Sequence, residues 1–262
     1  MASKRPCSSG AGWRFILFLF FFGFAITAIA QSTNHPVFAA RAEAEFHRAQ
    51  IQLQSDTNDF AAAWVFARAC YDFADFATND TERATIAVQG IATSRKLLAS
   101  RPKSAPGHYY LGMNLGQLAR TEILGALKLV REMEREFKTA DDLDEHFDYA
   151  GPARCLGLLY RDAPGWPASI GSRRKAREWL EHAAKLAPDY PENHLNLIES
   201  RLDWNDRTGA ESELNALDAL WPKAQTNLVG AVWEPSWADW TARKKAAEQS
   251  LAQPSQSPKA RH

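Results

Sequence analysis

The feature that most constrains this chain is an internal repeat in its second half. Three apolar residues and a proline recur after 34 residues with the same spacings of 4, 3 and 5: Ala176, Leu180, Ala183 and Pro188, then Ala210, Leu214, Leu217 and Pro222. Spacings of 4 and 3 place side chains on one face of a helix, and proline, which lacks the backbone N–H, is expected to stop it. Each series therefore predicts one helix of a repeated unit.

A partner helix is predicted in each unit from a second recurring pattern. Leu197 lies nine residues after Pro188, and Leu111, followed by Gly112, lies nine residues after Pro102. A glycine at this place lets a neighbouring helix approach closely. Since no segment shows the alternation typical of a β-strand, the sequence predicts an all-α chain built from helix pairs.

These units resemble the tetratricopeptide repeat, a 34-residue helix-turn-helix with a Leu-Gly pair, spaced alanines and a closing proline. The resemblance covers residues 60–222 and is most specific in two units, 152–188 and 189–222, whereas the pattern leaves the repeat boundaries within residues 31–150 open. It implies a superhelix, or solenoid, of stacked helical hairpins whose first helices line an inner surface.

The N-terminus has the layout of a secretory signal. An apolar run from Phe15 to Ile26 is followed by the small residues Ala28 and Ala30 and then by polar residues. This pattern predicts a signal peptide at 1–30, cleavage after Ala30 and a periplasmic location. The alternative is a segment retained as an anchor, which would be the chain's membrane connection.

A helical repeat domain is expected over residues 31–245, and a disordered, polar and proline-rich tail is expected over residues 246–262. Trp233, Trp237 and Trp240 form a stripe with spacings of 4 and 3 after the last repeat. Such a stripe predicts a C-terminal capping helix over the exposed apolar edge of the last repeat. The alternative is an aromatic platform for a sugar or a membrane surface.

The charge balance argues against nucleic acid as a partner. Lys plus Arg and Asp plus Glu both number 31, and removing residues 1–30 takes away basic residues only. A nucleic-acid-binding protein needs a basic face that neutralises phosphates and releases their counterions.

Sequence patterns of catalysis are also missing, so no catalytic residue, no cofactor and no enzymatic activity are predicted. There is no phosphate-binding glycine loop, paired-cysteine metal motif, HExxH helix or nucleophile elbow. The acidic segment 141–148 could supply oxygen ligands, but it lacks the glycine of a calcium loop, so we expect solvated side chains and no metal site. His108 and His194 occupy equivalent places in two units, which repeat equivalence explains more simply than paired metal ligands.

Cys70 and Cys155 are the thiols that remain after residue 30. An exported compartment would allow a disulfide between them. Both lie within apolar helical patterns of units that are not neighbours, so we expect two small buried core residues instead.

A second resemblance concerns residues 152–188. A Tyr-containing first helix, a Pro/Gly loop ending at Ile170-Gly171-Ser172 and a basic helix beginning Arg173-Arg174-Lys175-Ala176 are similar to the T-component proteins associated with TRAP-type transporters. This resemblance implies a periplasmic helical protein with a groove or pore that acts beside a substrate-binding protein in the uptake of organic ligands.

The inner surface of the superhelix is the predicted binding site, with candidate groove residues Tyr109, Met113, Asn114, Gln117, Arg154, Arg161 and Glu199. Arg154 and Arg161 suit a carboxylate through forked N–H donors, and Tyr109 adds apolar area with a hydroxyl. The sequence therefore predicts an exported, non-enzymatic binding protein for a small organic ligand, such as a transporter accessory that takes a carboxylate. The alternative is a protein–protein interaction scaffold of the cell envelope.

Overall fold

The computed structural model describes residues 36–122 and 125–253. Over these residues the chain forms ten α-helices and no strand, which confirms the predicted all-α fold. The predicted signal peptide at residues 1–30, with its cleavage after Ala30, lies outside the described residues, and so does the predicted tail from residue 254 onward. None of the helices described is both long enough and apolar enough to span a membrane.

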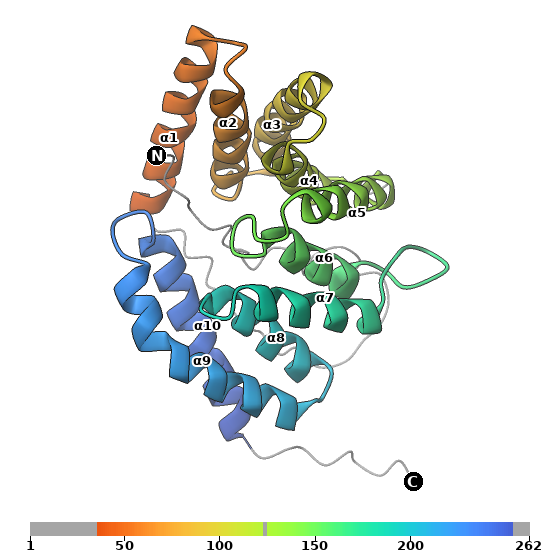
Figure 1. The fold of residues 1–262 in the computed structure, drawn as a ribbon, viewed down its shortest axis with the longest axis vertical. Coiled ribbons are helices and arrows are strands. Elements are labelled where there is room, and N and C mark those ends of the chain that lie inside the picture. Colours follow the sequence, from red (N-terminus) through yellow and green to blue (C-terminus); the bar gives the residue numbers. More distant parts are fainter. Residues whose placement is uncertain (1–35, 123–124, 254–262) are drawn as a thin grey trace. The chain divides into compact units, whose positions relative to one another are not determined.

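The chain divides after Ala187 into two compact units, where the sequence predicted one continuous repeat domain over residues 31–245. The first unit contains α1 (Pro36–Ser55), α2 (Phe60–Ala74), α3 (Asp80–Ser100), α4 (Ala105–Ala119), α5 (Ala126–Leu143), α6 (Gly151–Asp162) and α7 (Arg173–Leu186). The second unit contains α8 (Pro191–Asp203), α9 (Arg207–Asn227) and α10 (Glu234–Ala252) (Figure 1).

Within each unit, consecutive helices pack as antiparallel pairs. In the first unit α2 packs against α3, α4 against α5 and α6 against α7, while α1 packs against α2 (Figure 1). In the second unit α8 packs against α9, and α10 contacts both. The sequence repeat predicted at 152–188 is the α6–α7 pair, and the repeat predicted at 189–222 is α8 with most of α9.

Several helices begin at polar residues whose side chains bond the first free backbone N–H groups. Asp59 accepts from the N–H groups of Ala61 and Ala62, and Ser104 and Ser172 cap α4 and α7 in the same way. Such caps stabilise a helix by about 1 kcal/mol each. The helices α3 and α7 end two residues before Pro102 and Pro188, as the sequence predicted.

Pro222 does not end its helix, which corrects the prediction made from the repeat. It lies inside α9, which continues to Asn227. A proline inside a helix costs a backbone hydrogen bond. Leu217, Leu220 and Ala224 are buried on both sides of this position, so packing of the helix face outweighs that cost.

The core contains the close contacts that the Leu-Gly pairs predicted. A Cβ built on Gly112 would lie 2.5 Å from the Phe137 ring, and one built on Gly157 would lie 2.6 Å from Leu180. Each glycine therefore lets the second helix of its pair approach. Cys70 and Cys155 are free thiols in the core, so the prediction of two buried residues is confirmed.

The tryptophan stripe lies in a helix that covers the last pair of helices, which confirms the predicted capping helix. Trp240 on α10 is fully buried and Trp233 is buried at its start. The ring of Trp237 packs edge-on against Trp221 of α9, with centroids 5.2 Å apart. Because α10 extends to Ala252, residues 246–252 are helical, and the start of the predicted disordered tail at residue 246 is wrong.

Candidate functional site

The predicted groove residues of α4 lie in the core of the first unit. They are Tyr109, Met113, Asn114 and Gln117, and none is more than 2% exposed. The Asn114 amide donates to the backbone oxygen of Ala67 at 2.8 Å, so it ties α4 to α2. These residues are packing residues, which corrects the expectation of an open groove surface. The physical reason is that α4 contacts α2, α3 and α5 and has little free surface.

Arg154 is also buried, and its guanidinium holds a backbone turn. It is 1% exposed and donates to a carboxylate oxygen of Asp148 at 3.2 Å and to the backbone oxygen of Tyr149 at 3.1 Å. Asp148, Tyr149 and Ala150 have φ angles of 51°, 57° and 60°, the left-handed region that side chains disfavour. Arg154 therefore stabilises this turn before α6 and does not present its donors to a ligand.

Arg161 already has a carboxylate partner within the chain. Its Nε donates to Oδ1 of Asp162 at 2.6 Å, and its Nη2 donates to Oδ2 at 2.9 Å. This two-bond arrangement is the geometry by which arginine recognises a carboxylate. The predicted carboxylate site at Arg154 and Arg161 is therefore occupied by the protein's own acids.

Glu199 belongs to the second unit, in a network around Arg243 of α10. Its two carboxylate oxygens accept from Arg243 at 2.7 and 3.0 Å. Arg243 also donates to Glu192 at 3.0 Å and to Asp239 at 3.1 Å. Burial, together with the negative charges of Glu192 and Glu199, raises the pKa of Asp239 to about 6 although Arg243 opposes the shift. Glu199 thus helps to attach the capping helix.

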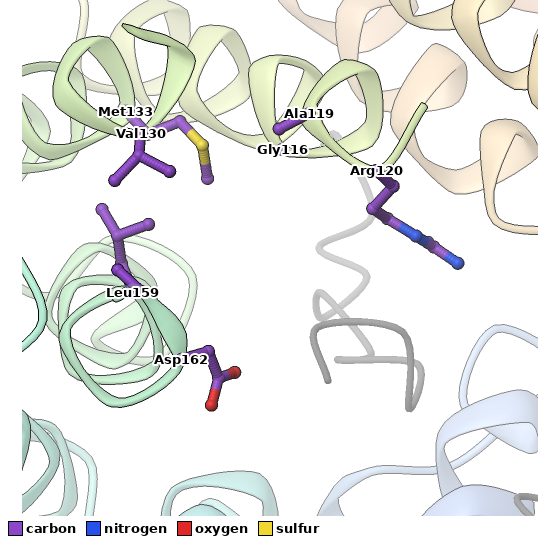
Figure 2. Close-up of a pocket in the computed structure, with 8 residues that line it drawn as sticks. Gly116, Ala119, Arg120, Val130, Met133, Leu159 and Asp162 are labelled. Atoms are coloured by element: carbon purple, nitrogen blue, oxygen red, sulfur yellow. The ribbon is translucent and has the colours of Figure 1, made fainter. Parts of the chain in front are cut away.

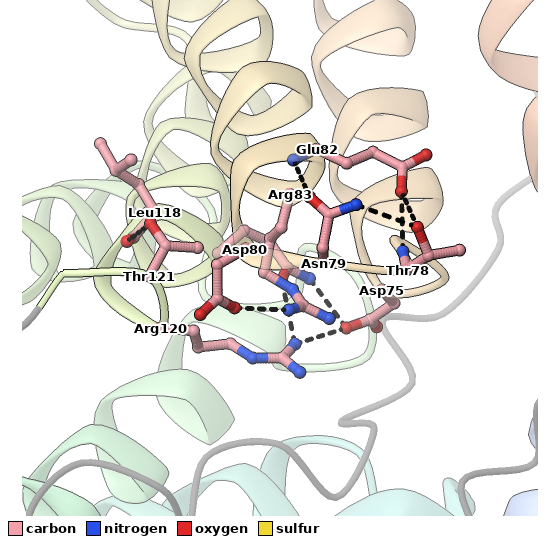
Figure 3. A network of polar contacts seen from close by, with 10 residues as sticks. Asp75, Thr78, Asn79, Asp80, Glu82, Arg83, Leu118, Arg120 and Thr121 are labelled. Carbon is pink, nitrogen blue, oxygen red and sulfur yellow. Dashed lines mark hydrogen bonds and ion pairs between the residues drawn. The ribbon is translucent and has the colours of Figure 1, made fainter.

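A polar cluster connects the ends of α2 and α4 in the first unit (Figure 3). The carboxylate of Asp75 accepts from Arg120 at 2.9 Å and from the Gln117 amide at 2.8 Å. Arg83 of α3 lies beside it, and burial and the nearby positive charge of Arg120 lower the pKa of the Arg83 guanidinium. The cluster pairs its charges internally, which indicates a structural link between helices.

A pocket opens next to this cluster between α4, α5 and α6 (Figure 2). Val130, Met133 and Leu159 form its apolar side, and Arg120 and Asp162 lie at its rim. Its volume is about 20 Å³, which is room for about one water molecule. A pocket of this size is too small for an organic ligand.

A much larger groove lies between α1 and α3, with the first half of α2 as its floor. Its volume is about 790 Å³, within the range of sites that hold small molecules. Gln50, Leu53 and Gln54 of α1 form one wall, and Phe60, Ala63 and Phe66 of α2 contribute to the floor. The second wall is α3, with Gln89, Ala92, Thr93 and Lys96.

This groove combines apolar floor residues with amide and basic groups along its walls. Lys96 and Arg101 are exposed at its rim, and the Arg101 guanidinium lies 5.7 Å from the centre of the Phe60 ring. This site was not predicted from the sequence because the repeat resemblance began at residue 60. The available signal was the apolar spacing Phe46, Ala49 and Leu53 beside Gln50 and Gln54, which marks α1 as an amphipathic helix.

Two histidines hold equivalent positions in the two units, as repeat equivalence predicted. His108 Nδ1 lies 2.6 Å from a carboxylate oxygen of Glu136, and its Nε2 lies 2.9 Å from the backbone oxygen of Pro102. His194 makes the same two contacts, at 2.6 Å with Glu213 and 2.8 Å with the backbone oxygen of Pro188. Each imidazole therefore links the second helix of its own pair to the loop that precedes the first helix of that pair.

The acidic segment before α6 serves local structure through two of its aspartates. Asp148 binds Tyr109 and Arg154, and Asp144 accepts from the backbone N–H of His146 at 3.2 Å. Over residues 36–122 and 125–253, no group of three or more His, Cys, Asp or Glu side chains is arranged to hold a metal ion.

Comparison with known proteins supports the fold. No protein-family model matches this chain, and no curated protein matches it. The crystal structure of a thermophilic TPR (tetratricopeptide repeat) protein from Thermus thermophilus is similar, with a TM-score of 0.56 at 19% sequence identity. The match covers 82% of this chain and 95% of that one. At this identity it shows the fold alone, which is the TPR-like helical-repeat fold; the T-component resemblance is not confirmed.

Proposed function

Starting from the TPR-like fold, we propose that this protein is a non-enzymatic scaffold that binds a segment of a partner protein in the groove between α1 and α3. The observation that carries the proposal is the volume of this groove, about 790 Å³, beside the burial of the groove residues predicted on α4. Helical-repeat folds commonly use extended surfaces of stacked helices to bind partners.

A peptide-display experiment tests this proposal. A random peptide library is selected on the purified chain, and enriched peptides are measured against the chain and against Ala92→Trp, which places a large ring in the groove. Ala92 is exposed on α3, so the substitution leaves the core unchanged. We expect peptides that bind the chain and lose affinity for the variant. Failure to enrich any peptide, or equal binding to both proteins, contradicts the proposal.

The location of this scaffold in the cell envelope is a separate part of the proposal, which rests on the apolar run and small residues of the N-terminus. Cell fractionation followed by mass spectrometry of the intact protein tests it. A periplasmic protein that begins at Gln31 supports export with cleavage, and a full-length protein in the cytoplasmic fraction contradicts it.

The transporter-accessory hypothesis adds a small organic acid as ligand, and its support is the loop and basic helix of residues 162–176. Arg154 and Arg161, which have the chemistry to bind a carboxylate, are paired with Asp148 and Asp162. A thermal-shift screen against organic acids tests this hypothesis, because a ligand of the folded state raises the melting temperature. A raised melting temperature supports a transporter accessory, and no change with any acid favours the peptide-binding scaffold.

A further inference from the structure

We propose that the α1–α3 groove is selective for an extended, acidic segment of its partner, with apolar side chains facing the groove floor. This inference rests on the proposed function, and it names the chemistry that the partner must carry. Three features of the groove support it: its charges, its amide groups and its floor.

The charges of the groove leave two cations for a partner. Asp59 is the acid that lines it, and its carboxylate accepts from the N–H groups of Ala61 at 2.8 Å and Ala62 at 3.2 Å. Lys96 of α3 donates to the backbone oxygen of Thr57, two residues before Asp59, at 3.4 Å. Within the part of the chain that the structure describes, no carboxylate forms an ion pair with Lys96 or Arg101.

The adjacent cation on the same helix behaves differently. Arg95 donates to Glu132 of α5 at 2.8 Å, so its charge is neutralised within the unit. Lys96 and Arg101 face the groove instead. Positive charges at the rim of a groove favour a partner with negative charges, through both the rate of encounter and the stability of the complex.

Amide side chains suit the backbone of an extended segment. Gln50 and Gln54 stand one helical turn apart on α1, and Gln89 faces them from α3. An amide group carries both donors and an acceptor. The Gln89 amide uses one donor on the backbone oxygen of Thr85 at 3.4 Å and keeps its second donor and its acceptor. A helix satisfies its own backbone groups, whereas an extended chain has N–H and C=O groups that need partners.

The floor gives room for apolar side chains between these polar walls. Leu53, Phe60 and Phe66 contribute apolar surface from α1 and α2. Successive side chains of an extended segment point to opposite sides, so alternate residues can contact the floor while the others face the exposed Lys96 and Arg101. The complementary sequence therefore alternates apolar and acidic residues.

Fluorescence anisotropy with the full chain tests this inference. Three labelled peptides of equal length alternate leucine with glutamate, glutamine or lysine. They are titrated with the chain, with the double variant Lys96→Glu/Arg101→Glu, and with the control Lys103→Glu. Lys103 is an exposed cation near the end of α3 that does not line the groove. Circular dichroism verifies that each variant is folded, and vesicles of anionic phospholipid are tested in parallel.

We expect the glutamate peptide to bind most tightly. The double variant should bind this peptide with an affinity about tenfold lower, which is the effect of two rim charges. The double variant should prefer the lysine peptide, a reversal that partial unfolding cannot produce, and Lys103→Glu should change little. Added salt should lower the affinity for the glutamate peptide more than that for the glutamine peptide.

Three outcomes overturn the inference, and they are distinguishable from failure of the scaffold itself. Equal binding of all three peptides removes the preference for acid but leaves the peptide-binding function. Binding to anionic vesicles that depends on Lys96 and Arg101, without peptide binding, replaces the protein partner by a lipid surface. If neither these peptides nor any displayed peptide binds, the proposed function itself is wrong.

Discussion

The first three helices of the first unit and the three helices of the second unit each combine a helix pair with one flanking helix, and the results are opposite. The flanking helix α1 packs against α2, one helix of its pair, whereas α10 contacts both α8 and α9. The flanking helix α10 supplies Trp240, which is fully buried, whereas α1 supplies Gln50 and Gln54 to the walls of a groove of about 790 Å³. The junction between flanking helix and pair is therefore closed where α10 contacts both helices and buries a large ring, and open where α1 contacts one helix and presents amide side chains.

The charged groups of the two junctions differ in the same way. In the second unit Arg243 bonds to Glu192, Glu199 and Asp239, and the Trp240 indole N–H donates to Glu192 at 2.7 Å. In the groove of the first unit, Lys96 and Arg101 have no such carboxylates among the described residues. The closed junction pairs the charge of Arg243 with its own carboxylates, and the open one leaves two cations for a partner.

The largest effect should come from breaking the closed junction with Trp240→Ala. The substitution creates a cavity and leaves the buried Glu192 without one of its donors, so we expect a loss of about 3–5 kcal/mol in the free energy of unfolding. Urea denaturation measures it, with Trp166→Ala as control because Trp166 is 88% exposed. A loss equal to that of the control would show that α10 contributes little.

The next largest effect on stability is expected from the contact between a histidine and a glutamate that occurs in both units. The hydrogen bond with Glu136 raises the pKa of His108 above its usual 6.5 despite burial. Burial opposes ionisation of Glu136, but its bonds with His108 and Arg135 hold the pKa of its carboxyl below 4.5. The His108 contribution is therefore complete below pH 6.5 and is lost as pH rises through the raised pKa, while that of Glu136 is lost as pH falls through its lowered pKa.

His108→Asn should accordingly cost about 2 kcal/mol, the value of a hydrogen bond to a charged group, at pH values between 4.5 and 6.5. The cost should shrink in alkaline solution. Unfolding titrations across pH provide the test, and His146→Asn, at an exposed histidine, is the matched control. A cost that does not depend on pH would mean that the ionised pair contributes nothing.

A smaller effect of opposite sign is expected for Asp239→Asn. An acid whose pKa is raised to about 6 binds protons more readily in the folded protein, so stability falls as pH rises from 3.8 to about 6. Removing this charge should increase stability at neutral pH by about 1 kcal/mol. Thermal unfolding at pH 7 and at pH 4 measures the difference. Destabilisation at pH 7 would show that the bond to Arg243 outweighs the burial of the charge.

The smallest effect on stability is expected when the open junction is made to resemble the closed one. Ala92→Trp introduces an aromatic ring at an exposed groove position, as α10 does at the other junction. Its free energy of unfolding should change by less than about 0.5 kcal/mol, the usual range for surface substitutions. Peptide binding should nevertheless be lost. A large loss of stability would show that the groove is narrower than its volume indicates.

The sequence predicted the helix pairs wherever the contacts between two helices require apolar residues or glycines at regular spacings. The apolar spacing at Ala176, Leu180 and Ala183 and the glycines at 112 and 157 follow directly from how one helix contacts the next, and all five residues lie at such contacts. The failure at Pro222 has the same origin: a local rule for proline predicted a helix end, and burial on both sides of it decided otherwise.

The candidate site was predicted less well than the fold. Helical periodicity predicts a surface position for Tyr109, Met113 and Asn114, because it cannot tell a helix with one buried face from a helix that is buried on several sides. Arg154 and Arg161 have the right chemistry for a carboxylate, but a sequence does not reveal that Asp148 and Asp162 already occupy their donors.

By itself the sequence determined the all-α class, the repeated helix pairs and the capping helix, because each depends on spacings of three and four residues along one helix. Only the tertiary structure decided which polar residues are free to bind and where the groove lies. Both depend on distances between side chains of different helices, and the periodicity of a single helix contains no information about its neighbours.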